Sequence, residues 1–250
     1  MDILEPDSGE ISFLGDKLNK KKMGYLPEAR GLYEETKVMD TILYFADLND
    51  MDRTIAKKEA EKWLDKLDLS DYKNNKIDDL SKGMQQKVQF IVSMIHKPKL
   101  LVLDELFSGL DPVNQDLFKN IVRNLVNEGT TILLSSHRMN LVEELCDRIF
   151  FINEGQRLLY GYLEEIRESF GFKGVKILTG NSILRNIFEE NSVIENVEYD
   201  DKKINFDINN KINIKEFLYQ LPEEIQIREL SVSNPSLHDI FVNTVKEGGN

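Results

Sequence analysis

Two adjacent acidic residues close an apolar run near the middle of the chain. The run KLLVLD ends at Asp104, and Glu105 follows it. Such a run is typical of a strand buried in a parallel sheet, and ligands of open α/β folds bind at the carboxyl ends of these strands. An aspartate there can hold Mg²⁺ and a neighbouring carboxylate can orient an attacking water, but a core strand that ends in acids by chance is the simpler alternative.

A histidine follows the next apolar run, TTILLSS, and the same reasoning places His137 at the same edge of the sheet. Between the two runs, the sequence SGLD brings Ser108, Gly109 and Asp111 into a tight turn before Pro112. Each feature has a plain alternative, because a lone histidine is more often structural or solvated and SGLD by itself indicates only a turn.

The sequence LSKGMQQK, from Leu80 to Lys87, is typical of a loop that leads into a helix. Ser81 suits the N-cap position, although Met84 three residues later rules out a capping box. A serine hydroxyl, a glycine that allows close approach and the free N–H groups of a helix N-terminus are also what a phosphate requires. The segment therefore predicts either an ordinary helix start or a phosphate site.

The surrounding pattern predicts an α/β fold with a second, smaller domain. Helical periodicity extends from Val38 to about Leu69, and short apolar runs then alternate with helices, as in parallel strands buried between helix layers. From about Lys173 to Val232 the expected order is β-α-β-β-α-β, followed by a last helix in SLHDIFVNTVK. We predict domains at 1–171 and 172–250, with a helical subdomain at about 36–80.

Composition limits the classes of partner. The 250 residues include 32 Lys plus Arg and 44 Asp plus Glu, and the formal net charge of −12 argues against a nucleic-acid partner. Cys146 is the one cysteine and lies in an apolar helical pattern, so we expect a buried, reduced thiol. No apolar run approaches the roughly 18 residues of a membrane span. Any role at a membrane would therefore depend on a partner.

Taken in this order, LSKGMQQK, LLVLDE, SGLD and SSH resemble the motifs of the ATP-binding cassette family, the ATPase subunits of ABC transporters. The resemblance implies that Asp104 is the Walker B aspartate, which holds Mg²⁺ through water. It implies that Glu105 is the catalytic glutamate and that His137 is the switch histidine that senses the γ-phosphate. The implied signature motif, which contacts the ATP of a partner subunit, is Ser81, Lys82, Gly83, Met84 and Gln85. The implied D-loop is Ser108, Gly109, Leu110 and Asp111.

The resemblance covers about Met1 to Phe170. LEPDSGEISFLG is similar to the segment after the first helix of these ATPases, and GYLPEARGLY is similar to their Q-loop region. Glu28 stands where the Q-loop glutamine is expected and is a second candidate for contact with Mg²⁺. Lys82 and Met84 replace a glycine and the glutamine of the usual signature, and Leu106 replaces a common proline. The tail resembles the C-terminal domain of bacterial sodium-efflux-type ATPases, which pair with ABC-2-type permeases.

One element of the family is absent from the 250 residues. The dipeptide Gly-Lys occurs nowhere, so there is no GxxxxGK[ST] P-loop (Walker A) to hold the β- and γ-phosphates. On the resemblance, the sequence starts before the end of the first helix or just after it. We interpret it as an incomplete P-loop NTPase domain, truncated at its N-terminus, joined to a small α+β domain. Such a chain alone is expected to be inactive as an ATPase.

The resemblance implies a subunit that binds and hydrolyses ATP with Mg²⁺ and powers a membrane exporter. Its partners would be a second ATPase subunit, in a head-to-tail homodimer, and an integral-membrane ABC-2-type permease that holds it on the inner face of the cell membrane, in the cytoplasm.

Two other functions compete with this one. A soluble cassette that acts on DNA or ribosomes predicts a long coiled coil, tandem cassettes or basic tracts, and this sequence has none of them. A degenerate cassette that only regulates or assembles with a full-length partner is favoured by the missing P-loop. The presence of Glu105 and His137 argues against that second alternative.

Overall fold

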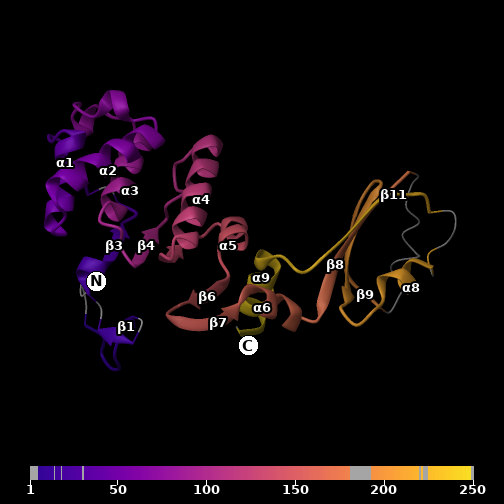
Figure 1. The fold of residues 1–250 in the computed structure, drawn as a ribbon. Helices are drawn as coiled ribbons and strands as arrows, with labels where there is room; N and C mark the ends of the chain where they lie inside the picture. Colours follow the sequence, from indigo (N-terminus) through magenta and orange to yellow (C-terminus); the bar gives the residue numbers. More distant parts are fainter. Residues whose placement is uncertain are drawn as a thin grey trace. The chain divides into compact units, whose positions relative to one another are not determined.

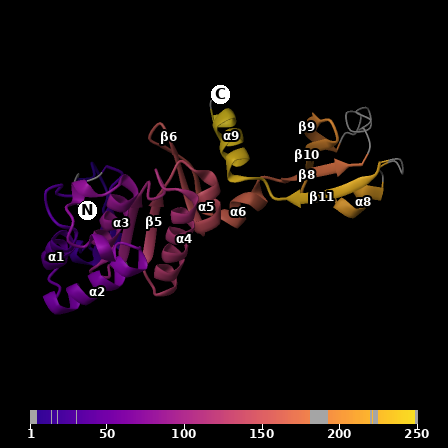
Figure 2. The same ribbon diagram turned by 90° about the horizontal axis from the view of Figure 1, so that it is seen from above.

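The chain divides into two compact units, Met1–His137 and Arg138–Asn250, which are described separately. The structure, a computed structural model, describes residues 5–13, 15–17, 19–29, 31–180, 193–219, 221 and 225–248. Figures 1 and 2 show the elements of each unit from two directions.

The first unit is built on a parallel sheet of three strands in the order β3-β4-β5. These strands are β3 (Met23–Leu26), β4 (Leu100–Asp104) and β5 (Thr131–Ser135). Leu103 of β4 pairs with Leu26 on one side and Leu134 on the other, and Asp104 pairs with Ser135 at the carboxyl ends. The parallel sheet confirms the predicted α/β class. A small antiparallel pair, β1 (Ser12–Phe13) and β2 (Asp16–Lys17), and the short helix η1 (Lys20–Lys22) come before it.

Two amphipathic helices follow β3, where the periodicity predicted a helical block. Helix α1 (Val38–Leu48) buries Val38, Ile42 and Ala46, one residue per turn. Helix α2 (Arg53–Lys66) starts at Asp52, whose side chain accepts hydrogen bonds from the next N–H groups of the helix. The short helices η2 (Ser70–Tyr72) and η3 (Ile77–Asp79) lead to α3 (Lys82–Met94), which contacts α1 and α2 (Figure 1).

Helix α3 lies directly against β3. A Cβ atom at Gly24 of β3 would lie 2.0 Å from the carbonyl oxygen of Ser93 in α3, so only glycine fits there. Helix α4 (Pro112–Asn127) contacts β5. The rings of Phe90 in α3 and Phe118 in α4 pack edge to face, with their centroids 4.9 Å apart. Both phenylalanines are fully buried, so they join the two helices in the core of the unit.

The second unit begins with α5 (Met139–Leu145), a hairpin of β6 (Arg148–Asn153) and β7 (Gln156–Tyr162), and α6 (Leu163–Ser169). The hairpin turns at Glu154 and Gly155, which both have positive φ, as a two-residue type I′ turn requires. Cys146 is half-buried beside this group of elements, and burial raises the pKa of its thiol.

A four-stranded antiparallel sheet follows, in the order β11-β8-β10-β9. Its strands are β8 (Phe172–Thr179), β9 (Ile194–Asp200), β10 (Lys203–Asn209) and β11 (Ile227–Ser233), with α8 (Ile214–Tyr219) before β11. The four predicted strands and the second predicted helix are therefore confirmed. The first predicted helix of this domain, SILRNIFEE, lies outside the described residues.

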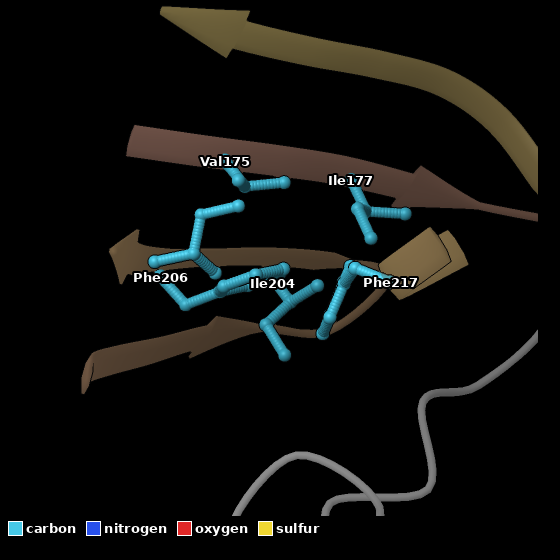
Figure 3. Close-up of a cluster of buried hydrophobic side chains, with 6 residues drawn as sticks. Val175, Ile177, Ile204, Phe206 and Phe217 are labelled. Atoms are coloured by element: carbon cyan, nitrogen blue, oxygen red, sulfur yellow. The ribbon is translucent and has the colours of Figure 1, made fainter. Parts of the chain in front are cut away.

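One face of this sheet forms a core with α8. Ile177 pairs with Ile204 across β8 and β10, and Val175 pairs with Phe206. Figure 3 shows these four side chains together with Phe217 of α8, whose ring centroid lies 5.5 Å from that of Phe206. Because paired residues share a face, the alternation of apolar residues along both strands accounts for this core.

The last helix, α9 (Leu237–Gly248), belongs to a different core. Leu237 and Ile240 are fully buried in a cluster with Ile149, Leu163 and Ile166 of β6 and α6. Among its described residues the second unit therefore has two hydrophobic clusters, and α9 completes the one that lies earlier in the sequence. The domain limits at 171 and 172 stay a prediction, but removal of everything after Gly171 would uncover this cluster.

Ile240→Ala tests this packing. We expect the substitution to destabilise the cluster by about 2–5 kcal/mol, because it opens a cavity among fully buried side chains. Amide hydrogen exchange of β6 and β7 should become faster. In the control His238→Ala, an exposed side chain of the same helix is lost, and we expect a change within about 0.5 kcal/mol. Equal exchange in the two variants would show that α9 does not stabilise the hairpin.

Candidate functional site

The carboxyl ends of β4 and β5 bring the predicted strand-end residues together. Asp104 pairs with Ser135, and the Ser135 hydroxyl donates a hydrogen bond to Oδ1 of Asp104. The backbone N–H of Glu105 donates to the Ser135 carbonyl oxygen at 3.2 Å. These contacts fix two carboxylates at one edge of the sheet, as the sequence predicted.

Glu105 contacts His137 directly. Oε1 of Glu105 accepts a hydrogen bond from the backbone N–H of His137 at 2.9 Å and lies 2.9 Å from Nδ1 of its ring. An ionised carboxylate can only accept, so we assign the proton to Nδ1, which leaves Nε2 to interact with another group. The imidazole is 76% exposed, so that interaction can involve a ligand.

The second carboxylate oxygen of Glu105, Oε2, is buried and has no hydrogen-bond partner among the described residues. The backbone of Glu105 also has φ of +49°, in the left-handed region that costs free energy for a residue other than glycine. A strained residue with an unused buried acceptor is a typical feature of a site that binds another group. A water molecule oriented by this carboxylate would satisfy it.

Helix α3 presents its N-terminus at the predicted phosphate site. Ser81 is the N-cap residue, as predicted, and its Oγ accepts a hydrogen bond from the N–H of Met84 at 3.3 Å. Ser81 and Lys82 are exposed, and a Cβ atom at Gly83 would meet no other atom within 4 Å. The open first turn therefore leaves room for an anion to approach the backbone N–H groups.

Three glutamine side chains of α3 hold other segments of the unit. Nε2 of Gln85 donates to the carbonyl oxygens of Ile77 and Leu80, just before the helix, at 2.9 and 3.2 Å. Nε2 of Gln86 donates to the carbonyl oxygen of Leu106, the residue after Glu105, at 3.4 Å. The helix that carries the candidate phosphate site is thus bonded to the segment that carries the carboxylate.

Gln89 extends this arrangement to the segment after β3. Its Nε2 donates to the carbonyl oxygens of Pro27 and Ala29 at 3.1 and 3.3 Å, on either side of Glu28. Gln89 is 4% exposed, whereas Glu28 is exposed. No described contact joins the Glu28 side chain to Asp104 or Glu105, so the structure positions the backbone of this segment and not its carboxylate.

The SGLD turn lies between Glu105 and α4. The N–H of Ser108 donates to the Glu105 carbonyl oxygen at 2.9 Å, and Gly109 has φ of +71°. Asp111 caps α4, and hydrogen bonds from Asn114 hold the pKa of its carboxyl below the usual value. Leu110 is the buried residue of the turn, whereas Ser108, Gly109 and Asp111 are exposed.

Sequence reasoning missed Ser135, Gln86 and Gln89. Ser135 ends the strand beside Asp104, so its position in TTILLSS was a signal for contact with that carboxylate. The two glutamines lie three residues apart, on one face of α3, and a glutamine on a helix usually indicates a solvated surface.

Comparison with known families and proteins identifies relatives of this chain. The family model "ABC transporter" matches residues 1–108, and the model "ATP-binding protein DrrA1-3-like, C-terminal domain" matches residues 161–245. The chain is similar to a solved structure titled "Structure of ATP binding subunit of ABC transporter", with a TM-score of 0.64 and 28% identity. That match covers 68% of this chain and 73% of the other.

Curated relatives extend over nearly the whole chain. The uncharacterized ABC transporter ATP-binding protein YhaQ of Bacillus subtilis is 43% identical over 246 residues, which is 97% of this chain and 82% of YhaQ. NatA of Bacillus subtilis, an ABC transporter ATP-binding protein, is 31% identical over 74% of this chain and 78% of NatA.

This chain belongs to the family of ABC transporter ATP-binding proteins. Members of this family bind ATP, typically with Mg²⁺, and hydrolyse it, and they work with a membrane permease. Within the part of the chain that the structure describes, no helix is both long enough and apolar enough to cross a membrane.

Gln89→Leu tests how α3 positions the segment after β3. We expect the variant to fold, because leucine has a similar volume, and to lose about 1 kcal/mol of stability with the two hydrogen bonds. Amide hydrogen exchange at residues 28–37 should become faster. The matched control is Gln115→Leu, which removes a glutamine-to-carbonyl hydrogen bond of α4, to Leu110. If both variants leave the exchange of residues 28–37 unchanged, Gln89 does not hold this segment.

Proposed function

We propose that this chain is the ATP-binding subunit of an exporter and that it supplies half of a nucleotide site shared by two subunits. The observation that carries the proposal is the contact of Glu105 with His137 at the ends of β4 and β5, beside Asp104. Acid, base and metal-binding groups meet there at the edge where α/β folds bind ligands.

Each of these side chains has a separate role in ATP hydrolysis. Glu105 orients the attacking water through its buried, unpartnered oxygen. His137 contacts the γ-phosphate through the ring nitrogen that does not face Glu105. Asp104 would hold Mg²⁺ through water, since carboxylate oxygens suit this ion, and bound Mg²⁺ would neutralise charge on the phosphates. Glu28 is a second candidate for contact with the ion.

The N-terminus of α3 serves the nucleotide of the other subunit. Ser81 and Gly83, with the first-turn N–H groups, form an open anion site at the N-terminus of α3. In a head-to-tail dimer this signature segment, Ser81 to Gln85, contacts the γ-phosphate held by the partner. The D-loop, Ser108 to Asp111, lies beside Glu105 and would contact the partner as well.

The chain as given contains no Gly-Lys pair and hence no P-loop lysine. We therefore propose that the 250 residues alone bind Mg-ATP no more tightly than about millimolar and do not hydrolyse it, because several charge-assisted hydrogen bonds are missing. The sheet also has an open edge. Among the described residues β5 has one neighbouring strand, β4, and Leu133 of β5 is 60% exposed.

The helical segment offers a surface for the permease. Tyr33, Tyr44 and Leu48 are exposed, and the rings of the two tyrosines pack edge to face with their centroids 6.0 Å apart. In the sequence, this apolar surface comes just after the segment that Gln89 holds. A permease bound to the surface could therefore respond to the position of that segment. An ABC-2-type permease would keep the chain on the cytoplasmic face of the membrane. Names of relatives favour export: one is the Nod factor export ATP-binding protein I of a Rhizobium species, at 31% identity.

A non-catalytic role is the second candidate. The missing P-loop favours a chain that only assembles with, or regulates, a full-length partner. The Glu105–His137 contact favours catalysis, since assembly alone would require neither group. The two candidates differ in whether Glu105 is needed for hydrolysis once a P-loop is present.

Glu105→Gln in a chimera that joins the P-loop segment of an ABC ATPase to this chain tests the proposal. We expect ATP binding to persist and hydrolysis to fall by roughly 10²-fold or more, because only the water-orienting carboxylate is lost. His137→Ala should also slow hydrolysis and change binding less.

The control Glu61→Gln makes the same charge change on an exposed position of α2. Calorimetry measures binding and phosphate release measures turnover. Normal turnover in Glu105→Gln would exclude Glu105 as the catalytic residue.

A further inference from the structure

A cavity of about 250 Å³ lies in the first unit, away from the carboxyl ends of the strands. It is lined by the end of α2, the segment between α3 and β4, the end of α4 and the residue before β5. Lys99 precedes β4, whereas Asp104 ends it, so the strand separates the two sites by roughly 13–17 Å. The cavity is therefore distinct from the candidate nucleotide site.

The floor of the cavity is apolar. Trp63 of α2, Met94 of α3, Leu101 of β4 and Ile121 of α4 contribute to the lining, and each is less than a tenth exposed. Pockets that bind small molecules are mostly apolar, with a few polar groups that fix the orientation of the ligand. This floor suits an aromatic or branched aliphatic group.

The rim of the cavity is basic. Four lysines and two glutamates line it, in a chain whose formal net charge is −12. Lys97 pairs with Glu59 at 3.0 Å, and Nζ of Lys66 lies 4.7 Å from the centroid of the Trp63 ring, a cation–π contact. Within the described residues no ion pair engages Lys62 or Lys99. Two ammonium groups therefore remain to bind an anion above the apolar floor.

The lysines also have a simpler explanation. Lysine near the end of a helix offsets the partial negative charge there, and this accounts for Lys62 and Lys66 in the last turns of α2. It does not account for Lys99, which precedes a strand, nor for an apolar cavity beneath the charges. The two explanations differ in whether a small anion occupies the cavity.

We propose that this cavity binds a small amphipathic anion, with an apolar body on the Trp63 floor and a carboxylate or phosphate group between Lys62 and Lys99. The volume is below the roughly 300–1,000 Å³ usual for drug-sized ligands, so the molecule is smaller than a nucleotide. It would contact α2 together with the ends of β4 and α4. The proposal does not depend on the nucleotide site.

Trp63 makes the test direct, because it is the only tryptophan of the chain and lines the cavity. Three probes share one apolar body and differ in charge: 4-phenylbutyrate, 4-phenylbutan-1-ol and 4-phenylbutylamine. Titrations of the 250-residue chain are followed by Trp63 fluorescence and by its single indole N–H resonance. We expect saturable binding of the acid, about tenfold or more tighter than the amine, with the alcohol between them.

Variants localise the anion. Lys62→Glu combined with Lys99→Glu should weaken binding of the acid by about tenfold or more, because two exposed cations become anions. The matched control is Lys57→Glu, an exposed position of α2 outside the cavity, which should leave binding unchanged. The proposal is overturned if the acid leaves the indole resonance unchanged, if the three probes bind equally, or if Lys57→Glu weakens binding as much as the double variant.

Discussion

Hydrogen bonds from the glutamine side chains of α3 are the constraint on which the candidate site depends. Gln86 and Gln89 are almost fully buried, and each donates to the backbone of a segment distant in sequence. A buried amide that lost its partners would cost free energy, so these segments cannot move away from α3 without a penalty. One helix therefore fixes the relative positions of the candidate anion site at Ser81, the segment after Glu105 and the segment that carries Glu28.

The parallel sheet supplies the other half of the geometry. Because β4 and β5 run in the same direction and pair through Asp104 and Ser135, the residues that follow them meet, and Glu105 contacts His137. Asp104 reaches the site from the end of β4 itself, whereas Glu105 does so through a backbone in the left-handed region. The strain at Glu105 and its unpartnered oxygen are consistent with a group that is satisfied only when water or a ligand is present.

Sequence alone could predict what depends on strand direction and periodicity. The meeting of Asp104, Glu105 and His137 at one edge follows from two apolar runs in a parallel sheet, and the N-cap at Ser81 follows from its residue type. The packing of α9 could not be predicted, since an amphipathic pattern shows which face is buried and not what covers it. The lysine-rimmed cavity was hidden for a similar reason, because its lining comes from segments far apart in the chain.

ATP hydrolysis by a mixture of two inactive chains tests the shared site most directly. One chain is the 250-residue protein, with Ser81 intact and no P-loop, and the other is the P-loop chimera with Ser81→Arg. The account predicts no hydrolysis by either chain alone and measurable phosphate release from the mixture, since Ser81 of the first chain completes the site of the second. A mixture that stays inactive, although sedimentation shows that the two chains associate, would contradict it.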